Sequence, residues 1–122
     1  MTILVADDNA CSRELIGELL ESSGHVILEA CNGREALELI RRRLPDLVFV
    51  DLQMPVQDGF SVIRELRNDQ RFHKLPVVAV TASAMLGDRE RAIAAGFDSY
   101  IAKPIDLREI EMQVEVLASR SR

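Results

Sequence analysis

The sequence predicts an α/β fold, namely a doubly wound sheet of five parallel strands with helices on both faces. Short apolar runs alternate with longer segments of helical periodicity along the 122 residues. Three of these runs contain almost no polar residue, as expected of strands buried on both faces. Strict alternation of strand and helix implies right-handed crossovers, which place helices on both sides of a parallel sheet. A chain of this length with 48% hydrophobic residues fits one domain with a sizeable core.

We expect five strands, because each short apolar run is bounded by polar or turn-forming residues. The fifth run is the shortest and the most mixed in polarity, which is typical of a strand at the edge of a sheet. The first, third and fourth runs would form the central strands. The expected ranges are 2–6, 26–30, 47–50, 77–81 and 99–101.

The first helix is expected to begin after Asn9, whose side chain suits an N-cap, and to end before Gly24. The other four helices repeat apolar residues every three or four positions after a turn signal. The second ends where Pro45 breaks it, and the fourth spans residues 84–95 before Gly96. The apolar positions are Cys11, Leu15, Ile16, Leu19 and Leu20 in the first helix, Ala36, Leu37 and Ile40 in the second, Phe60, Ile63 and Leu66 in the third, and Leu107, Ile110, Val114 and Leu117 in the fifth.

Charge and cysteine content exclude several classes of protein. The formal charge of -5 argues against nucleic acid as a direct partner, because a phosphate backbone calls for a basic patch. Cys11 and Cys31 are too few for a disulfide framework and lack metal-ligand spacing, so we expect both to be buried or half-buried apolar residues. The sequence shows neither a signal peptide nor a run of about 18–20 apolar residues that could span a membrane. We therefore expect a cytoplasmic chain that does not bind membranes.

Polar residues follow or end four of the five predicted strands. They are Asp7, Asp8, Asp51, Thr81 and Lys103. In a doubly wound sheet, ligands bind outside the carboxyl ends of the strands, at the switch point in strand order. We therefore expect these side chains to lie close together there. We also expect the Asp51 carboxylate to be displayed rather than buried, because the strand turns directly into a loop.

Three carboxylates and one ammonium predict a site for a divalent cation and a phosphoryl group. Carboxylates from neighbouring strands repel each other, and a hard dication with oxygen ligands relieves that repulsion. Mg²⁺ fits best and Mn²⁺ could substitute, whereas zinc is disfavoured because no histidine or cysteine lies beside the acids. An aspartate can attack phosphorus to form an aspartyl phosphate. Lys103 would offset charge on the transferring group, and the Thr81 hydroxyl would donate a hydrogen bond to it.

Four motifs in this order at strand ends together resemble the receiver domain of bacterial two-component response regulators. They are Asp7-Asp8, Asp51 followed by Leu52-Gln53-Met54-Pro55 and Asp58-Gly59, Thr81-Ala82, and Tyr100 through Lys103-Pro104. Each motif alone is weak, but the combination is highly specific and the resemblance covers essentially the whole chain. It implies a flavodoxin-like (βα)5 sheet of strand order 2-1-3-4-5. Residues 1–118 would form the receiver domain, and residues 119–122 a C-terminal tail.

The resemblance also implies a role for each site residue. Asp51 would be the phosphoacceptor, taking a phosphoryl group from the phosphohistidine of a sensor histidine kinase or phosphotransfer protein. Asp8 would be a direct Mg²⁺ ligand, and Asp7 would act mainly through a bound water. The backbone carbonyl of Gln53 would complete the metal ligands that the protein supplies, with Asp51 among them. Lys103 would pair with the phosphoryl group.

Thr81 and Tyr100 would form a switch that responds to phosphorylation, because a phosphoryl group adds charge and three strong hydrogen-bond acceptors. The readout would be a face formed by the fourth helix, fifth strand and fifth helix, to which we assign Met85, Arg89, Tyr100 and Glu111. In the family this face contacts output domains, downstream proteins or a second copy. The chain would be a signalling domain and not an enzyme, although it would promote its own phosphorylation and dephosphorylation. Gln53 and Ser83 would tune the lifetime of the phosphorylated state.

Other functions fit parts of the pattern. An Mg²⁺-dependent phosphohydrolase also forms an aspartyl phosphate, but Gln53 stands where a second acid would be needed for general acid/base catalysis. A nucleotide or flavin binder would need glycines in the first turn, where this chain has Asp7 and Asp8. A degenerate receiver would lack acids that are present here. The sequence leaves open the cognate kinase, the output, and whether the receiver stands alone or belongs to a longer regulator or hybrid kinase.

Overall fold

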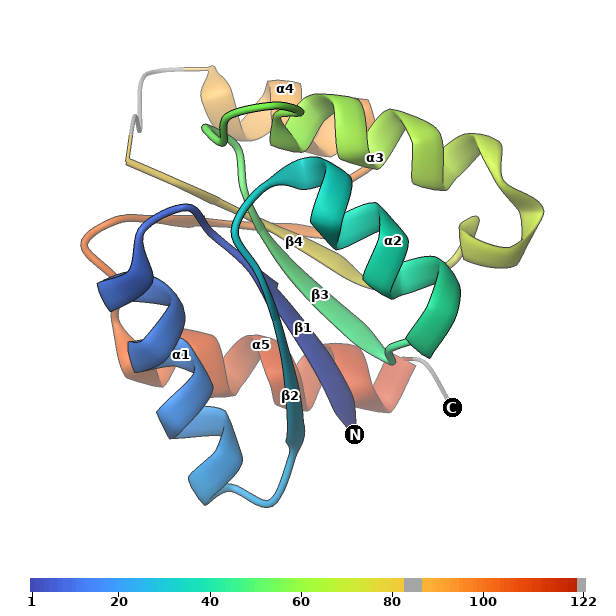
Figure 1. Cartoon of the computed structure of the whole chain (residues 1–122). Coiled ribbons are helices and arrows are strands. Elements are labelled where there is room, and N and C mark those ends of the chain that lie inside the picture. Colours follow the sequence, from blue (N-terminus) through green and yellow to red (C-terminus); the bar gives the residue numbers. More distant parts are fainter. Residues whose placement is uncertain (83–86, 121–122) are drawn as a thin grey trace.

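A computed structural model of the chain describes residues 1–82 and 87–120, with side chains up to residue 118. In these ranges five strands alternate with five α-helices, and a short 3-10 helix follows the third α-helix (Figure 1). The strands are β1 (Thr2–Ala6), β2 (Val26–Ala30), β3 (Leu47–Asp51), β4 (Val77–Thr81) and β5 (Ser99–Ala102). The helices are α1 (Ala10–Ser22), α2 (Gly33–Arg43), α3 (Gly59–Asn68), η1 (Gln70–Phe72), α4 (Asp88–Ala95) and α5 (Leu107–Arg120).

The five strands form one parallel sheet in the order β2-β1-β3-β4-β5. This order confirms the predicted topology, with the almost entirely apolar strands β1, β3 and β4 in the centre. The shortest strand, β5, lies at one edge, as expected. The chain leaves β2 at the other edge and enters β3 on the far side of β1. The switch point of the sheet therefore lies between β1 and β3, where a doubly wound fold places its ligand site.

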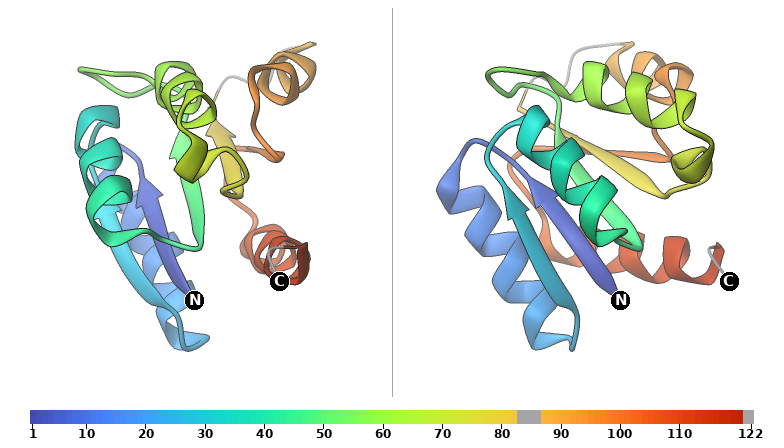
Figure 2. Two further views of the ribbon diagram at one scale, coloured as in Figure 1. Left: turned by 90° about the vertical axis from the view of Figure 1, so that its right-hand side faces the viewer. Right: turned by 45° about the vertical axis from the view of Figure 1, so that its right-hand side comes forward.

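The sheet separates two apolar layers, because successive side chains of a strand point to opposite faces. The views in Figures 1 and 2 show α2, α3 and α4 on one face of the sheet, and α1 and α5 on the other. Leu4, Val48 and Ala79 belong to the first layer, whereas Phe49 and Val78 belong to the second. Full burial of a leucine, valine or phenylalanine side chain stabilises the fold by about 1.5–3 kcal/mol. Helices thus cover both faces of the central strands, so a ligand site can form only at the ends of these strands.

Three side-chain caps define where the first three α-helices begin. Asn9, Asn32 and Asp58 each accept a hydrogen bond from the backbone N–H three residues later, at 3.1, 2.9 and 2.8 Å. Such a cap typically contributes about 1 kcal/mol, because it satisfies an amide that has no partner within the helix. The predicted start of the first helix at Asn9 is confirmed. All three caps lie in turns that follow the carboxyl ends of strands, so they also fix the loops around the candidate site.

Some local expectations differ from the structure. Strands β3 and β5 each extend one residue further than predicted, to Asp51 and Ala102. Cys11 and Cys31 are exposed rather than buried, because they occupy the first turn of α1 and the turn before α2. Leu15 is 44% exposed, since α1 packs on the sheet mainly through its other apolar positions.

The fourth helix is described only from Asp88 onward. Its predicted start at Ala84 therefore lies outside the described residues, and so do the assignments made for Ser83 and Met85. The apolar faces predicted for the second, third and fifth helices are confirmed, because Ile40, Ile63 and Ile110 are all fully buried. In the part of the chain that is described, no helix has the length and apolar character needed to cross a membrane.

Candidate functional site

Three carboxylates meet at the carboxyl ends of β1 and β3. Ala6 of β1 is paired with Val50 of β3, so the residues that follow the two strands lie side by side. Asp7, Asp8 and Asp51 each offer an oxygen, and these oxygens lie within 4.8 Å of one another. The acids singled out in the sequence thus come together at the switch point of the sheet. We call these three residues the acidic cluster.

Two members of the acidic cluster are buried. Asp7 is 2% exposed and Asp51 is 4% exposed, whereas Asp8 is exposed. The expectation that Asp51 would be displayed is therefore wrong. Asp51 is still part of β3, which has a neighbouring strand on each side, and the Lys103 side chain lies against its carboxylate. Burial strengthens electrostatic interactions with this carboxylate, because little water is present to screen them.

Each buried acid is oriented by the backbone amide two residues further on. The Asn9 N–H donates to Asp7 Oδ1 at 2.8 Å, and the Gln53 N–H donates to Asp51 Oδ1 at 2.9 Å. In both residues the second oxygen is left for other partners. The Gln53 contact places the start of the β3–α3 loop directly beside Asp51.

Lys103 joins the two buried acids. Its Nζ lies 3.1 Å from Oδ2 of Asp7 and 3.1 Å from Oδ2 of Asp51. Only the contact with Asp51 has hydrogen-bond geometry, and Asp7 Oδ2 is buried without a hydrogen bond to any described residue. The Lys103 N–H donates to the Thr81 carbonyl at 2.7 Å, which fixes the base of the lysine next to β4. One ammonium faces three acids, so the cluster remains negative and suits an additional cation.

The electrostatics of Asp51 and Lys103 reflect this crowding. The pKa of Asp51 is raised from 3.8 to about 6. Burial is the main cause and the charge of Asp7 adds to it, whereas the Gln53 amide and Lys103 oppose the shift. Burial alone would lower the pKa of Lys103, but its close contacts with the carboxylates of Asp7 and Asp51 raise it overall. Lys103 is therefore protonated at neutral pH. A carboxyl group with a strongly raised pKa beside a specific cation is a marker of functional sites.

Arg13 also supports the site, although sequence reasoning did not identify it. Its Nη1 donates to the Asp7 carbonyl at 2.8 Å, and its Nε pairs with Glu29 at 3.1 Å. These contacts tie α1 and β2 to the backbone that carries the acids. The signal in the sequence is weak, since a cation one turn into a helix normally indicates only a solvated residue.

Thr81 and Tyr100 occupy the neighbouring strands β4 and β5. Thr81 ends β4 and is 2% exposed. The Tyr100 hydroxyl is buried without a hydrogen-bond partner among the described residues. Burial raises the pKa of Tyr100, and the charges of Asp88 and Glu90 raise it further. A buried hydroxyl without a partner destabilises this ring position, and that cost would favour a second position in which the hydroxyl is hydrogen-bonded.

A cavity of about 310 Å³ begins next to the acidic cluster, between the β3–α3 loop and α4. Asp51 does not line it, but Leu52 and Gln53, which follow directly, do. This volume exceeds that of several water molecules, each of which occupies about 30 Å³ in the liquid. The cavity therefore provides space for water or a small group beside the site. Its lining residues are Leu52, Gln53, Asp58, Phe60, Thr81, Asp88 and Arg91.

The acidic cluster fits a hard divalent cation. All three candidate side-chain ligands are carboxylates. Oxygen ligands of this kind suit Mg²⁺ or Mn²⁺, whereas zinc sites usually include histidine or cysteine. The buried Asp7 Oδ2 lacks a hydrogen bond, and a metal ion or a metal-bound water would supply the missing interaction. The residues present therefore fit the ion that the family resemblance implies.

Comparisons with known proteins agree with the fold and the site. The chain matches the family model of the response regulator receiver domain over residues 3–115. It is 40% identical to the polar-differentiation response regulator DivK of Brucella anthropi over 106 residues, which cover 87% of this chain and 86% of that protein. The receiver domain of the Francisella response regulator 1452 superposes with a TM-score of 0.93 at 30% identity, covering 99% and 98% of the two chains.

A second solved structure is informative about the metal. The receiver domain of a sensor histidine kinase from Pseudomonas aeruginosa has a magnesium ion coordinated in its active site cleft. It superposes on this chain with a TM-score of 0.86 at 31% identity, covering 96% of this chain and 97% of that one. The family model and the identity to curated response regulators together establish membership. The chain belongs to the family of response regulator receiver domains, which act as phosphorylation-activated signalling switches.

Proposed function

We propose that Asp51 accepts a phosphoryl group from a phosphohistidine on a sensor histidine kinase or phosphotransfer protein. One observation carries the proposal: Asp51 is a buried carboxylate held by the Gln53 amide, 3.1 Å from Lys103 Nζ and grouped with two further acids. An oxygen of Asp51 bonds to phosphorus while the phosphorus–nitrogen bond to the partner breaks. The electron pair of the broken bond returns to the imidazole nitrogen.

The other residues of the site prepare Asp51 for this transfer. Asp7, Asp8, Asp51 and the Gln53 backbone carbonyl would hold Mg²⁺, with Asp7 acting mainly through a water; Mn²⁺ could replace it. When bound, the ion supplies positive charge that offsets the charge of the transferring group. Lys103 already lies between two carboxylates, so it would turn to a phosphoryl oxygen without moving its backbone. In this way the domain would promote its own phosphorylation. Water entering from the neighbouring cavity would then hydrolyse the aspartyl phosphate.

The proposal includes a response and a partner surface. Thr81 would donate to a phosphoryl oxygen, and Tyr100 would change position with it, altering the face formed by α4, β5 and α5. Arg89 and Glu111 on that face are exposed, as a contact surface requires. An output domain or downstream protein would bind there, and a homodimer through the same face is an alternative. Residues 1–118 would act as the receiver domain, with 119–122 as a tail, in the cytoplasm.

The phosphohydrolase alternative has no support from the relatives reported above, which are response regulators or receiver domains. The exposed side chain two residues past Asp51 is Gln53, which cannot serve as a general acid.

The proposal is tested by intact-mass measurement with Mg²⁺ and a small-molecule phosphodonor. The wild-type chain should gain about 80 daltons, the mass of one phosphoryl group, and Asp51→Asn should not. Asp46→Asn serves as a matched control, because Asp46 is an exposed acid before β3, at the opposite end of that strand from Asp51. A gain that persists in Asp51→Asn, or no gain in the wild-type chain, would contradict the assignment.

A further inference from the structure

The β3–α3 loop, residues 52–58, contains a strained turn. The Gln57 N–H donates to the Pro55 carbonyl at 2.7 Å, which closes a three-residue turn around Val56. Val56 has a φ of 68°, in the left-handed region that β-branched residues rarely adopt. Turns of this hand are rare and strained. The Val56 side chain is 76% exposed, so its own packing does not hold it in this conformation.

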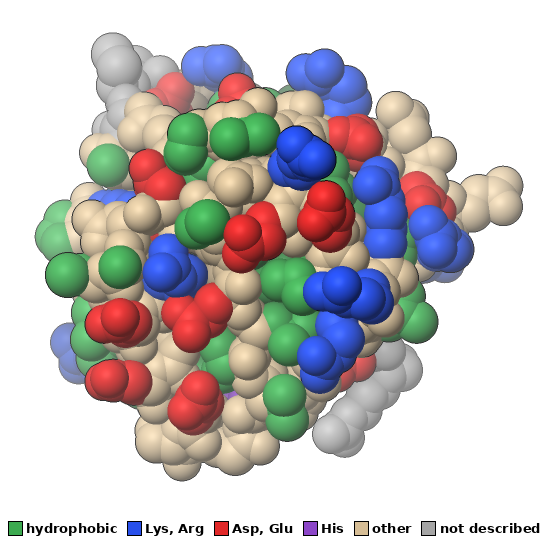
Figure 3. Space-filling model, viewed as in Figure 1, with side chains coloured by type: hydrophobic (Ala, Val, Ile, Leu, Met, Phe, Trp, Pro, Cys, Tyr) green, Lys and Arg blue, Asp and Glu red, His purple; other side chains and the backbone are tan. Residues whose placement is uncertain are grey.

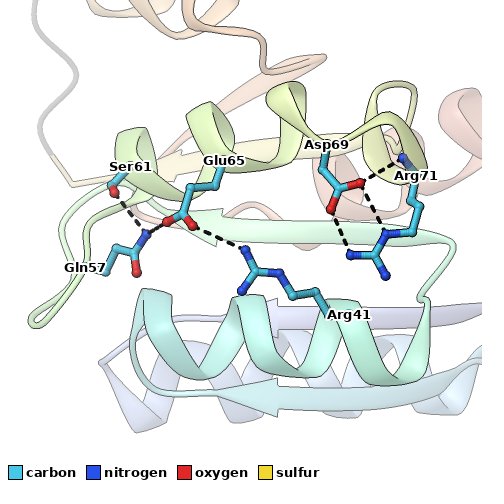
Figure 4. A network of polar contacts seen from close by, with 6 residues as sticks. All are labelled: Arg41, Gln57, Ser61, Glu65, Asp69 and Arg71. Carbon is cyan, nitrogen blue, oxygen red and sulfur yellow. Dashed lines mark hydrogen bonds and ion pairs between the residues drawn. The ribbon is translucent and has the colours of Figure 1, made fainter.

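Contacts of Gln57 hold the turn in place. The Gly33 N–H at the start of α2 donates to the Gln57 carbonyl at 3.0 Å. Figure 4 shows the Gln57 side chain reaching α3, where its Nε2 donates to Ser61 Oγ at 3.0 Å and to Glu65 Oε2. Glu65 in turn pairs with Arg41 of α2 at 3.2 Å. Strained backbone persists only where surrounding contacts determine it, and here those contacts come from two helices.

The approach between the loop and α2 is very close. A Cβ atom added to Gly33 would lie 2.1 Å from the Gln57 carbonyl oxygen. The backbone would have to move to remove this clash. The absence of a side chain at Gly33 therefore permits the hydrogen bond. Gln57 is thus tied through its backbone to α2 and through its side chain to α3.

The same loop begins at the candidate site. The Gln53 N–H donates to Asp51, and the Leu52 N–H donates to the Val80 carbonyl at 2.8 Å. Only residues 54 and 55 separate Gln53 from the strained Val56. If the turn relaxed, the backbone around Gln53 would move with it. A movement of the turn at Val56 would therefore be passed along two residues to the Gln53 carbonyl.

We propose that Gln57 is a positioning residue for the cation site: its contacts with α2 and α3 hold the strained turn at Val56 and so keep the Gln53 carbonyl at the acidic cluster. The inference rests on the proposed function for the identity of the site. It adds a residue that touches neither the cation nor the phosphoryl group. It also assigns a use to the Arg41–Glu65 pair, which supports the Gln57 side chain from outside.

The test uses Mg²⁺ titrations followed by amide chemical shifts of the whole chain. Gln57→Ala should weaken Mg²⁺ binding about tenfold, because the turn is released. Gln70→Ala is the matched control, an exposed glutamine outside this network, and should bind within about twofold of wild type. The double variant Val56→Asn with Gln57→Ala should recover most of the loss, because asparagine tolerates the left-handed conformation. The inference is overturned if the double variant binds Mg²⁺ as weakly as Gln57→Ala does. It is also overturned if the Mg²⁺ affinity of Gln57→Ala lies within twofold of wild type.

Hydrogen exchange separates failure of this inference from failure of the proposed function. In Mg²⁺-free protein, the Gly33 amide should exchange about tenfold faster in Gln57→Ala than in wild type, because its acceptor is no longer held. Equal exchange rates would overturn the tether whether or not the site binds a cation. Conversely, the Gly33 amide could exchange faster in Gln57→Ala while wild-type protein binds no Mg²⁺. That result would support the role of Gln57 in holding the loop and would contradict the cation site.

Discussion

At the scale of single residues, Asp51 illustrates the conflict between burial and charge. Desolvation raises the free energy of a carboxylate, and the single contact with Lys103 only partly offsets it, because Lys103 is shared with Asp7. The folded protein therefore holds Asp51 at a free-energy cost when no cation is present. Such a cost is typical of functional sites, where stability is lower than another residue would allow.

The raised pKa of Asp51 gives a pH-dependent prediction. Its folded-state pKa of about 6 exceeds the ordinary 3.8, so between these values the folded state binds more protons than the unfolded state. The contribution of Asp51 to the free energy of unfolding should therefore increase as the pH falls from 7 to 5. Asp51→Asn removes the charge, so at pH 7 without Mg²⁺ it should be more stable by about 1–2 kcal/mol, discounted for solvent screening.

Urea unfolding in the presence of a chelator checks this prediction. The stability difference between Asp51→Asn and wild type should shrink as the pH is lowered to 5, because wild-type Asp51 becomes neutral. His25 acts in the opposite direction, since burial and the N-terminal charge lower its pKa. The comparison at each pH cancels that contribution, which both proteins share. A difference that stays constant from pH 7 to 5 would show that Asp51 does not titrate in this range.

At the scale of secondary-structure elements, Arg67 joins four segments. From α3 its guanidinium donates to Asp98 Oδ2 at 3.0 Å and to three backbone carbonyls, those of Gly96 at 2.9 Å, Phe72 at 2.8 Å and His73 at 3.3 Å. Asp98 Oδ2 also accepts the Val77 N–H at 2.8 Å, at the start of β4. Both side chains are largely buried, which lowers the pKa of Arg67 despite the opposing effect of Asp98. This arrangement fixes how α3, η1 and the α4–β5 turn meet the sheet.

Replacing Arg67 should destabilise the fold strongly. Arg67→Met would remove the guanidinium from four acceptors and leave the Asp98 carboxylate without its cation, with a loss of about 2–4 kcal/mol in the free energy of unfolding. Arg67→Lys should recover little, because an ammonium cannot reach all four acceptors from one position. Arg34→Met is the control. Both side chains of the Arg34–Glu38 pair are exposed, so the loss in the free energy of unfolding should stay below about 0.5 kcal/mol. Urea unfolding measures all three, and a loss under about 1 kcal/mol in Arg67→Met would contradict this role.

The elements differ in how well the sequence predicted them. Positions such as Leu37 and Ile40 were predicted to be buried because helical periodicity is a local signal, and the cap at Asn9 is a local signal as well. Arg67 was not predicted, because its partners lie 5, 6, 29 and 31 residues away and follow no local pattern. The burial of Asp51 was missed for the same reason. It depends on Lys103, which is 52 residues away along the chain.

At the scale of the whole molecule, charge is distributed unevenly over the surface. In Figure 3 acidic side chains gather over α1, and basic side chains gather over the C-terminal end of α2. The basic group includes Arg41, Arg42 and Arg43 in the last turn of α2, where cations interact favourably with the helix dipole. A partner protein approaching this domain would therefore meet opposite charges on different sides, which favours one orientation of encounter.

The helices are also unequally anchored. In the described part of the chain, α4 spans the eight residues Asp88–Ala95 and buries only Ala92 among them. Its N-cap is Gly87, which provides no side-chain cap. Helix α2, by comparison, buries four residues and has a hydrogen-bonded cap at Asn32. Elements with few buried contacts open at the lowest free energy and are those that move in allosteric proteins. A change at Asp51 should therefore reach α4 and β5 more readily than α2.

We expect a phosphoryl mimic to alter α4 and β5 selectively. A shift of a two-state equilibrium from 1:99 to 99:1 needs a differential free energy of about 5.5 kcal/mol, which several charge-assisted hydrogen bonds at a new anion can supply. With Mg²⁺ and beryllofluoride, hydrogen exchange should change at residues 77–81, 88–95 and 99–102, which include Thr81 and Tyr100, and remain constant in β2. Asp51→Asn under the same conditions should show no change. Equal changes in the variant, or changes confined to the acidic cluster, would mean that binding at Asp51 is not transmitted to the α4–β5–α5 face.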